Sequence, residues 1–187
     1  IAQLRGNKNT TVSAQYNFEN TISVQHNAPK PSGEPELFDA GVQQWQVEDE
    51  SLSGYGVTFS NSDNRYLKIG TLLGLQATIG KGFSIGIVRR IQNEAGRKVH
   101  AGIQTLSNNA LAVELHLLDG ETGKPSRAIY LPENTRLQLG RCLLMPKAFH
   151  STGRQAKLKA QGKAYTIRLQ EPVERGPDYV QAGFDVL

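Results

Sequence analysis

From Trp45 onward the sequence consists of short runs in which apolar and polar residues alternate, and Gly, Asn, Asp and Pro separate one run from the next. In residues 156–160, Ala-Lys-Leu-Lys-Ala, the apolar residues occupy every second position. Successive side chains of a β-strand point to opposite faces, so a period of two is typical of a strand with one buried face. Repeated along the chain with short turns between, this pattern predicts an all-β fold of the sandwich or barrel type.

The same pattern divides the chain into two β domains. We expect strands at residues 56–60, 71–78, 84–92, 99–106, 111–118, 127–131, 136–145, 156–160, 164–170 and 179–186. The strongest turn-forming stretch of the second half, Asp-Gly-Glu-Thr-Gly-Lys-Pro-Ser, occupies residues 119–126 and marks the expected boundary. Residues 34–118 are then expected to form one small β-barrel, and residues 119–187 a second small β-barrel or sheet.

The first 33 residues lack this alternation. They are rich in Asn, Thr, Ser, Gln, Gly and Pro, which predicts an extended N-terminal arm or linker with at most one strand, at residues 21–25. Residues 35–44 are expected to form a short helix or turn. Pro35 suits a first helical position, and Phe38, Val42 and Trp45 would share one helical face.

Composition excludes several classes of protein. The chain has 187 residues, 38% of them hydrophobic, and no apolar stretch approaches the roughly 20 residues that a membrane-spanning helix needs. Cys142 is the only cysteine, so the chain forms no internal disulfide and no cysteine-based zinc site. We expect Cys142 to be a small buried residue in a protein of a reducing compartment.

The net charge is only +4, but the charges are unevenly distributed. Residues 31–64 contain seven acidic and no basic residues, whereas residues 136–170 contain eight basic and no acidic ones. Such an asymmetry either marks an anionic partner or holds two halves of a protein together.

No motif for catalysis stands out. The four histidines, His26, His100, His116 and His150, are scattered along the chain without the spacing of metal ligands. The sequence contains no Gly-x-Ser-x-Gly, His-Glu-x-x-His or phosphate-loop motif, and the glycine-rich residues 80–86 are typical of a hairpin turn. We therefore expect a binding protein and not an enzyme, with no catalytic residues, no metal and no cofactor.

One segment does carry a motif for ligand binding. Asp49-x-Ser51-x-x-Gly54 resembles the [Asp/Asn]-x-Ser-x-x-Gly element of PilZ domains, small β-barrels that bind the bacterial messenger cyclic di-GMP. The segments that follow are similar in order to the PilZ barrel over about residues 45–118. The resemblance implies a cyclic di-GMP receptor of the bacterial cytoplasm.

The chemistry of the motif suits that ligand. Asp49 would accept hydrogen bonds from guanine N–H groups, and Ser51 with backbone N–H groups would contact phosphate. Gly54 would let the backbone approach the ligand closely.

The sequence departs from the PilZ pattern in its arginines. PilZ domains place Arg-x-x-x-Arg ahead of the motif, and here Arg5 is the only arginine before it. Arg89 and Arg90 are the candidate substitutes, because arginine pairs with guanine or phosphate and stacks on bases. In a regular strand the isoleucines at 85, 87 and 91 would face the core together with Arg89, leaving Arg90 outside. Both arginines would then line one pocket only if the strand contained a bulge.

Two other functions compete with this hypothesis. The missing Arg-x-x-x-Arg favours a degenerate PilZ-like adaptor that binds a protein partner and no nucleotide. The basic residues 136–170, with Phe149 and Tyr165 as stacking residues, favour a nucleic-acid-binding barrel. Nucleic-acid binding would weaken steeply with salt, whereas a dinucleotide held in a pocket would depend on salt less.

Overall fold

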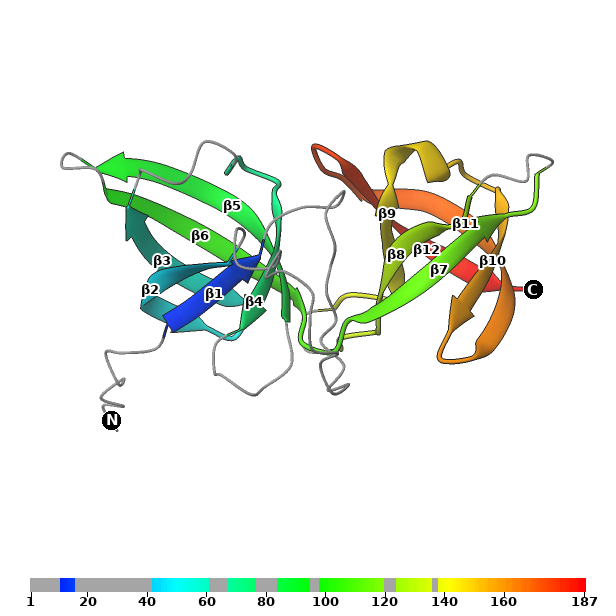
Figure 1. Cartoon of the computed structure of the whole chain (residues 1–187), viewed down its shortest axis with the longest axis horizontal. Coiled ribbons are helices and arrows are strands. Elements are labelled where there is room, and N and C mark those ends of the chain that lie inside the picture. The colour runs from blue at the N-terminus through cyan, green and yellow to red at the C-terminus, as the bar shows by residue number, and fades with distance from the viewer. Residues whose placement is uncertain are drawn as a thin grey trace, which may run out of the picture. The chain divides into compact units, whose positions relative to one another are not determined.

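The computed structural model describes residues 11–15, 42–60, 67–76, 84–94, 98–119, 124–135 and 138–187, and it folds them into two closed β-barrels (Figure 1). The all-β fold predicted from the alternation is confirmed. The chain divides into two units, residues 1–106 and residues 107–187, and each unit contains one barrel. Among the described residues, no helix is long and apolar enough to cross a membrane.

Six strands in the order β1-β2-β3-β6-β5-β4 form the first barrel. They are β1 Thr11–Gln15, β2 Val42–Ser51, β3 Gly54–Ser60, β4 Leu72–Gln76, β5 Ser84–Glu94 and β6 Lys98–Ser107. The barrel closes because β1 pairs in antiparallel fashion with both β2 and β4. Inside, the rings of Trp45 and Phe59 stack with their centroids 4.3 Å apart, next to Val57, Leu73, Leu75, Val88, Val99, Ala101 and Ile103.

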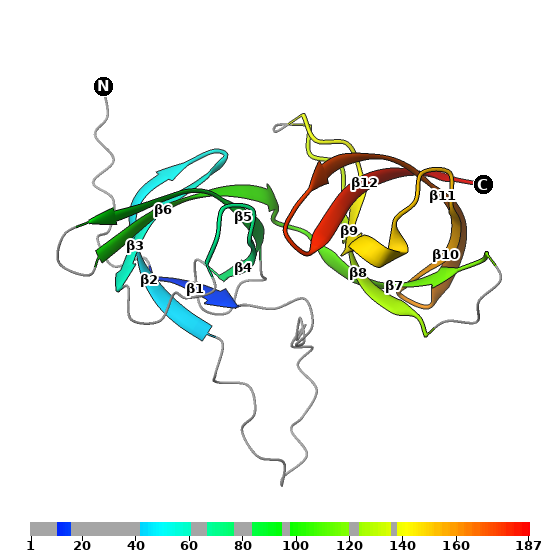
Figure 2. The ribbon, with the colours of Figure 1, turned by 90° about the horizontal axis from the view of Figure 1, so that it is seen from above.

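The second barrel has the strand order β10-β11-β12-β9-β8-β7, and Figure 2 shows these strands surrounding a common centre. The strands are β7 Leu111–Leu117, β8 Ser126–Leu131, β9 Cys142–Pro146, β10 Gln155–Ala160, β11 Lys163–Arg175 and β12 Tyr179–Val186, and a short 3-10 helix, η2 Lys147–Phe149, follows β9. The alternation predicted for β10 is observed. Ala156 and Leu158 are buried in the core, while Lys157 and Lys159 are exposed.

The boundary between the two units lies earlier in the chain than the sequence predicts. We expected residues 111–118 in the first barrel, but β7 pairs with β8 and β10 of the second. The physical reason is that β7 buries Val113 and Leu115 in the second core. Turn-forming composition at residues 119–126 therefore marks a connection between β7 and β8 and not the division between the barrels.

The N-terminal region differs from the prediction at two places. Thr11–Gln15 is a barrel strand and not part of an arm, because its backbone supplies the hydrogen bonds that join β2 to β4. The helix expected at residues 35–44 is wrong at its end, where Val42 begins β2. The remainder of that segment, and the strand expected at residues 21–25, lie outside the described residues.

One further strand is shorter than predicted. The alternation at residues 136–145 predicts a continuous strand, but β9 begins only at Cys142, and before it Asn134 forms an isolated bridge with Leu139. Cys142 is buried, as predicted, and Gln181 Nε2 donates a hydrogen bond to its Sγ at 3.2 Å. Burial raises the pKa of this thiol above its usual value.

Candidate ligand-binding site on the first barrel

The Asp-x-Ser-x-x-Gly motif forms the hairpin between β2 and β3. Ser51 pairs with Gly54 across a two-residue turn, and its hydroxyl donates a hydrogen bond to the Gly54 carbonyl at 3.3 Å. A Cβ built on Gly54 would overlap the carbonyl oxygen of Ile103, so the backbone there leaves room for glycine alone. The Thr105 N–H donates to the Ser53 carbonyl at 2.8 Å, which holds the hairpin tip against β6.

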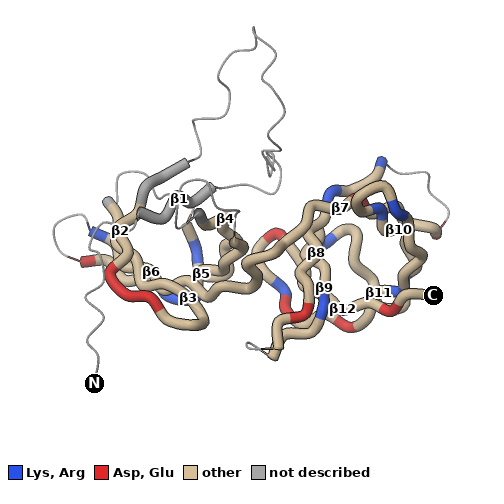
Figure 3. The backbone as a smooth tube through the Cα atoms, turned by 90° about the horizontal axis from the view of Figure 1, so that it is seen from below, with Lys and Arg blue, Asp and Glu red and all other residues tan. Residues whose placement is uncertain are grey.

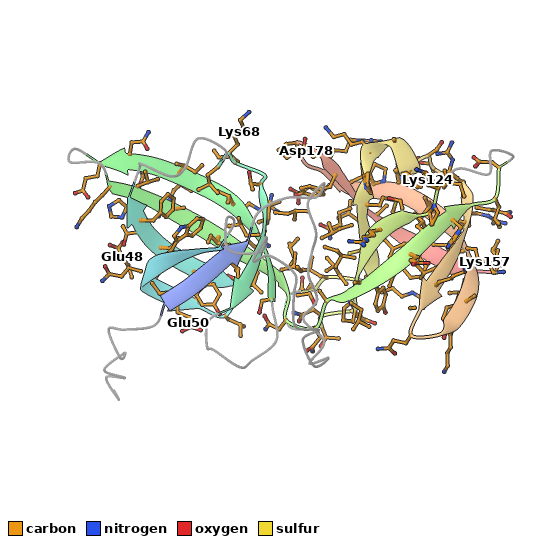
Figure 4. All side chains as sticks on the ribbon, viewed as in Figure 1. Glu48, Glu50, Lys68, Lys124, Lys157 and Asp178 are labelled. Carbon is orange, nitrogen blue, oxygen red and sulfur yellow. The ribbon has the colours of Figure 1, made fainter. Side chains whose placement is uncertain are left out.

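An irregularity in β2 directs the acidic residues outward. The register between β2 and β3 shifts between Val47 and Asp49, as in a β-bulge. Val47 packs against the core, and Asp49 lies opposite Gly56 on the outer face of the barrel. Figure 3 shows the acidic run of residues 48–50 as a red stretch on β2, and Figure 4 shows the Glu48 and Glu50 side chains pointing away from the barrel.

Strand β5 contains a similar break in alternation. Val88 belongs to the core and Ile91 packs against it, so Arg89 and Arg90 lie between two inward-facing residues and are both exposed. Arg89 Nε donates to Gln104 Oε1 at 2.8 Å. Arg90 lies beside Gly102, because a Cβ built on Gly102 would be 3.5 Å from Arg90 Cβ. Both side chains therefore lie over the outer face of β6.

The predicted facing of β5 is wrong before this break. Ile85 and Ile87 are buried but do not belong to the core cluster, whereas Val88 does. Gly86 also faces inward, since a Cβ there would come within 2.7 Å of Ile103 Cγ2 and Leu75 Cδ1. The side chains of Ile103 and Leu75 occupy the space above Gly86, so a residue larger than glycine would crowd them there.

All five residues predicted for ligand binding line one hollow, which we call the arginine hollow. Its lining comprises Asp49, Ser51, Ser53, Gly54, Tyr55, Gly56, Arg89, Arg90, Gly102, Ile103 and Gln104, and its volume is about 380 Å³. That volume lies near the lower end of the roughly 300–1,000 Å³ of small-molecule sites. Two guanidinium groups, a carboxylate and two serine hydroxyls thus converge on one surface, a combination suited to an anionic ligand with hydrogen-bonding edges.

Several residues of the hollow were not predicted from the sequence. Gly56 and Gly102 are glycines inside strands, a position that often marks a close approach of a ligand, and this signal was available. Gln104 and Tyr55 carried no such signal. Tyr55 is half-buried, and its pKa is raised above the usual value by burial and, secondarily, by the negative charge of Glu50.

Next to the hollow, His100 joins two strands through two carboxylates. Its Nδ1 lies 3.0 Å from Glu48 Oε2 on β2, and its Nε2 lies 2.9 Å from Glu94 Oε2 on β5. These hydrogen bonds, to Glu94 first and to Glu48 second, raise the pKa of His100 above its usual 6.5, and the imidazole lowers the pKa of Glu94. Within the described part of the chain, no group of His, Cys, Asp and Glu side chains is arranged to hold a metal ion.

The residues proposed for nucleic-acid binding lie on the second barrel and differ in their exposure. Phe149 is partly buried and packs against the core, while Tyr165 is 41% exposed. Lys157 is exposed on β10, and Figure 4 shows its side chain pointing away from the barrel. Arg154 forms an ion pair with Asp119, with 2.7 Å between Nε and Oδ2. Phe149 therefore presents little of its ring for stacking on a base.

A small β-barrel with the Asp-x-Ser-x-x-Gly motif in its first hairpin and a cationic hollow beside it is a domain of the PilZ class. Comparison with family models agrees. The model described as the middle PilZ domain of the cyclic-di-GMP receptor FimW matches residues 3–111, and the model of the FimW C-terminal β-barrel domain matches residues 111–187. The chain belongs to the FimW family of cyclic-di-GMP receptors. No curated protein and no solved structure matched the chain.

Proposed function

We propose that this chain binds cyclic di-GMP in the arginine hollow and serves bacterial signalling as a receptor, not as an enzyme. The observation that carries the proposal is the convergence of the β2–β3 hairpin with two arginines from β5. Asp49 and Ser51 lie some forty residues before Arg89 and Arg90 in the sequence, yet all four line the same hollow. Membership of a family described as cyclic-di-GMP receptors supports the same function.

The residues of the hollow match the groups of the ligand. Cyclic di-GMP presents two phosphates and two guanines, and arginine is the side chain that recognises both, by paired hydrogen bonds and by stacking. The Asp49 carboxylate is an acceptor for guanine N–H groups. The hydrogen bond from Arg89 to Gln104 directs this guanidinium over β6, and such orientation before the ligand arrives would lower the entropic cost of binding. Arg89 and Arg90 would then perform the role of the missing Arg-x-x-x-Arg.

Isothermal titration of the whole chain with cyclic di-GMP tests the proposal. We expect binding by the wild-type chain and an affinity at least tenfold weaker in Arg89→Ala and in Arg90→Ala, because a hydrogen bond to a charged group contributes about 1.5–3 kcal/mol. Arg127→Ala, an exposed arginine on β8 of the second barrel, is the matched control and should bind like wild type.

The possible outcomes separate the competing functions. The absence of binding heat with wild type, together with an unchanged melting temperature at high ligand concentration, would contradict the proposal and favour a protein-interaction adaptor. Equal losses in Arg127→Ala and Arg90→Ala would place the ligand elsewhere. Affinity for a single-stranded oligonucleotide that falls steeply with salt would instead support the nucleic-acid alternative.

A further inference from the structure

Two paired glycines form the part of the arginine hollow that we call its floor. Gly56 of β3 and Gly102 of β6 are direct partners across the two strands, and both line the hollow. At one edge of this floor lies Asp49, whose Cβ would be 3.3 Å from a Cβ built on Gly56. At the other edge lies Arg90, whose Cβ and Nε would be 3.5 and 3.9 Å from a Cβ built on Gly102. The two glycines thus lie between Asp49 and Arg90, and the Arg90 side chain packs beside Gly102.

The fold itself does not require glycine at position 102. A Cβ on Gly54 would overlap backbone, and a Cβ on Gly86 would crowd two core side chains, so those glycines are explained by packing. A Cβ on Gly102 would meet Arg90 only at an ordinary van der Waals distance, and Gly102 has no positive φ. Glycine in the middle of a strand is destabilising by roughly 0.5–1 kcal/mol relative to alanine. The packing of the protein alone therefore favours a side chain at this position.

We infer that the Gly56–Gly102 floor receives the flat face of a guanine base of cyclic di-GMP, and that Gly102 is a specificity-determining residue of the site. The inference rests on the proposed function, and it specifies which part of the ligand contacts which surface of the hollow. A flat aromatic ring needs a flat surface, and two adjacent glycines provide one. Asp49 then lies where the polar edge of the base needs an acceptor, and Arg90 lies where a guanidinium can contact the base or the phosphate attached to it.

The test uses Gly102→Ala and Gly102→Val in the whole chain, titrated with cyclic di-GMP and melted without ligand. We expect both variants to melt at or above the wild-type temperature, because valine and alanine lose less entropy than glycine in a strand. We expect the affinity to fall at least tenfold in Gly102→Ala and further in Gly102→Val, as the larger side chain fills the floor. Gly140→Ala, at a glycine with no atom within 4 Å of a built Cβ, is the control and should bind normally.

The outcomes distinguish this inference from the function on which it rests. If wild type does not bind cyclic di-GMP, both fail. If wild type and Gly102→Val bind equally well, the inference that guanine lies on the floor is wrong, while the receptor function stands. Loss of binding accompanied by a lower melting temperature in both variants would assign Gly102 a structural role and also overturn the inference. A nuclear Overhauser contact between guanine H8 and the Gly56 or Gly102 α-protons is expected in the complex.

Discussion

His100 lies on β6 and contacts carboxylates of two other strands, Glu48 of β2 and Glu94 of β5. Strand β5 is next to β6, whereas β2 is separated from β6 by β3. Its neighbours in this cluster are Glu48, Glu94 and Lys98, and the charge of Lys98 also contributes to the lowered pKa of Glu94. The imidazolium form thereby fastens the segment that carries Asp49 to the strand that carries Arg89 and Arg90. The arrangement stabilises the two sides of the arginine hollow against one another.

This arrangement predicts a pH-dependent contribution to stability. The pKa of His100 is raised in the folded protein, so protonated His100 stabilises the fold. This stabilisation is fully present below pH 6.5, the usual pKa of histidine, and it is lost as the pH rises through the raised pKa of the folded protein. The pKa of Glu94 is lowered, so ionised Glu94 also stabilises the fold, and this stabilisation is lost only as the pH falls into the acid range through the lowered pKa. We therefore expect His100→Gln to lower the melting temperature more at about pH 6 than at about pH 9.

Thermal melting of wild type, His100→Gln and His116→Gln at the two pH values checks this prediction. His116 is a suitable control because it contacts a carboxylate of its own strand on the other barrel, with 3.4 Å between Nε2 and Glu114 Oε2. A melting-temperature difference between wild type and His100→Gln that does not change with pH would show that the carboxylate contacts contribute no stability.

At the scale of elements, alternation in the sequence located most strands, because a period of two is a local property that one buried face imposes. Strand β12 is observed at the predicted residues, and β7 differs by one residue at its end. Alternation could not decide which face of β5 points into the barrel, because residues 85–88 are buried on both faces of the strand. In the structure Val88 belongs to the core, and Gly86 faces Leu75 and Ile103 of the neighbouring strands.

Some residues of the candidate site could likewise be predicted from the sequence, and others depend on the fold. The motif residues Asp49, Ser51 and Gly54 are adjacent in sequence, so they could be identified before the fold was known. Arg89 and Arg90 could be named only as candidates, because a break in alternation brings both to one face. The pairing of Gly56 with Gly102 depends on the register of β3 with β6, and no local pattern reports that register.

The polar composition of β1 gave no indication that it is a strand of the barrel. Its sequence is mostly polar, but Ser13 pairs with Gln44 on one side and with Gln76 on the other, within a closed barrel. We expect Ser13→Pro to destabilise the first barrel by about 1–3 kcal/mol, because proline removes a backbone donor and leaves a carbonyl without its partner. Ser13→Thr keeps the donor and favours strands, and should melt like wild type.

Fluorescence of Trp45 reports the Ser13 variants directly. Trp45 is the only tryptophan of the chain, it is 3% exposed, and it stacks on Phe59 inside the first barrel. Equal unfolding midpoints for Ser13→Pro and Ser13→Thr would contradict the role of β1 in closing the barrel.

For the whole molecule, the main feature is that each barrel has a core of its own. Ile167 is fully buried in the core of the second barrel, whereas the nucleotide is proposed to bind the first. Truncation of a buried isoleucine to alanine costs about 2–5 kcal/mol. We expect Ile167→Ala to lower the stability of the second barrel while the unfolding midpoint from Trp45 fluorescence and the affinity for cyclic di-GMP stay at the wild-type values.

Circular dichroism, which reports strands of both barrels, provides the comparison. We expect its transition to shift or to split in Ile167→Ala while the Trp45 transition does not move. Val57→Ala in the first core is the reciprocal variant, and it should move the Trp45 transition. A Trp45 transition that moves equally in both variants would show that the two barrels unfold as one cooperative unit.

The most direct test of the central claim, that cyclic di-GMP binds in the arginine hollow of the first barrel, is amide hydrogen exchange of the whole chain with and without the nucleotide. Amides closed off by a ligand exchange more slowly, in proportion to the stabilisation that the ligand gives. We predict slower exchange in residues 49–56 and in residues 89–104, with no change in β10 and β11. Unchanged exchange in both of the first two segments, or protection confined to the second barrel, would contradict the account.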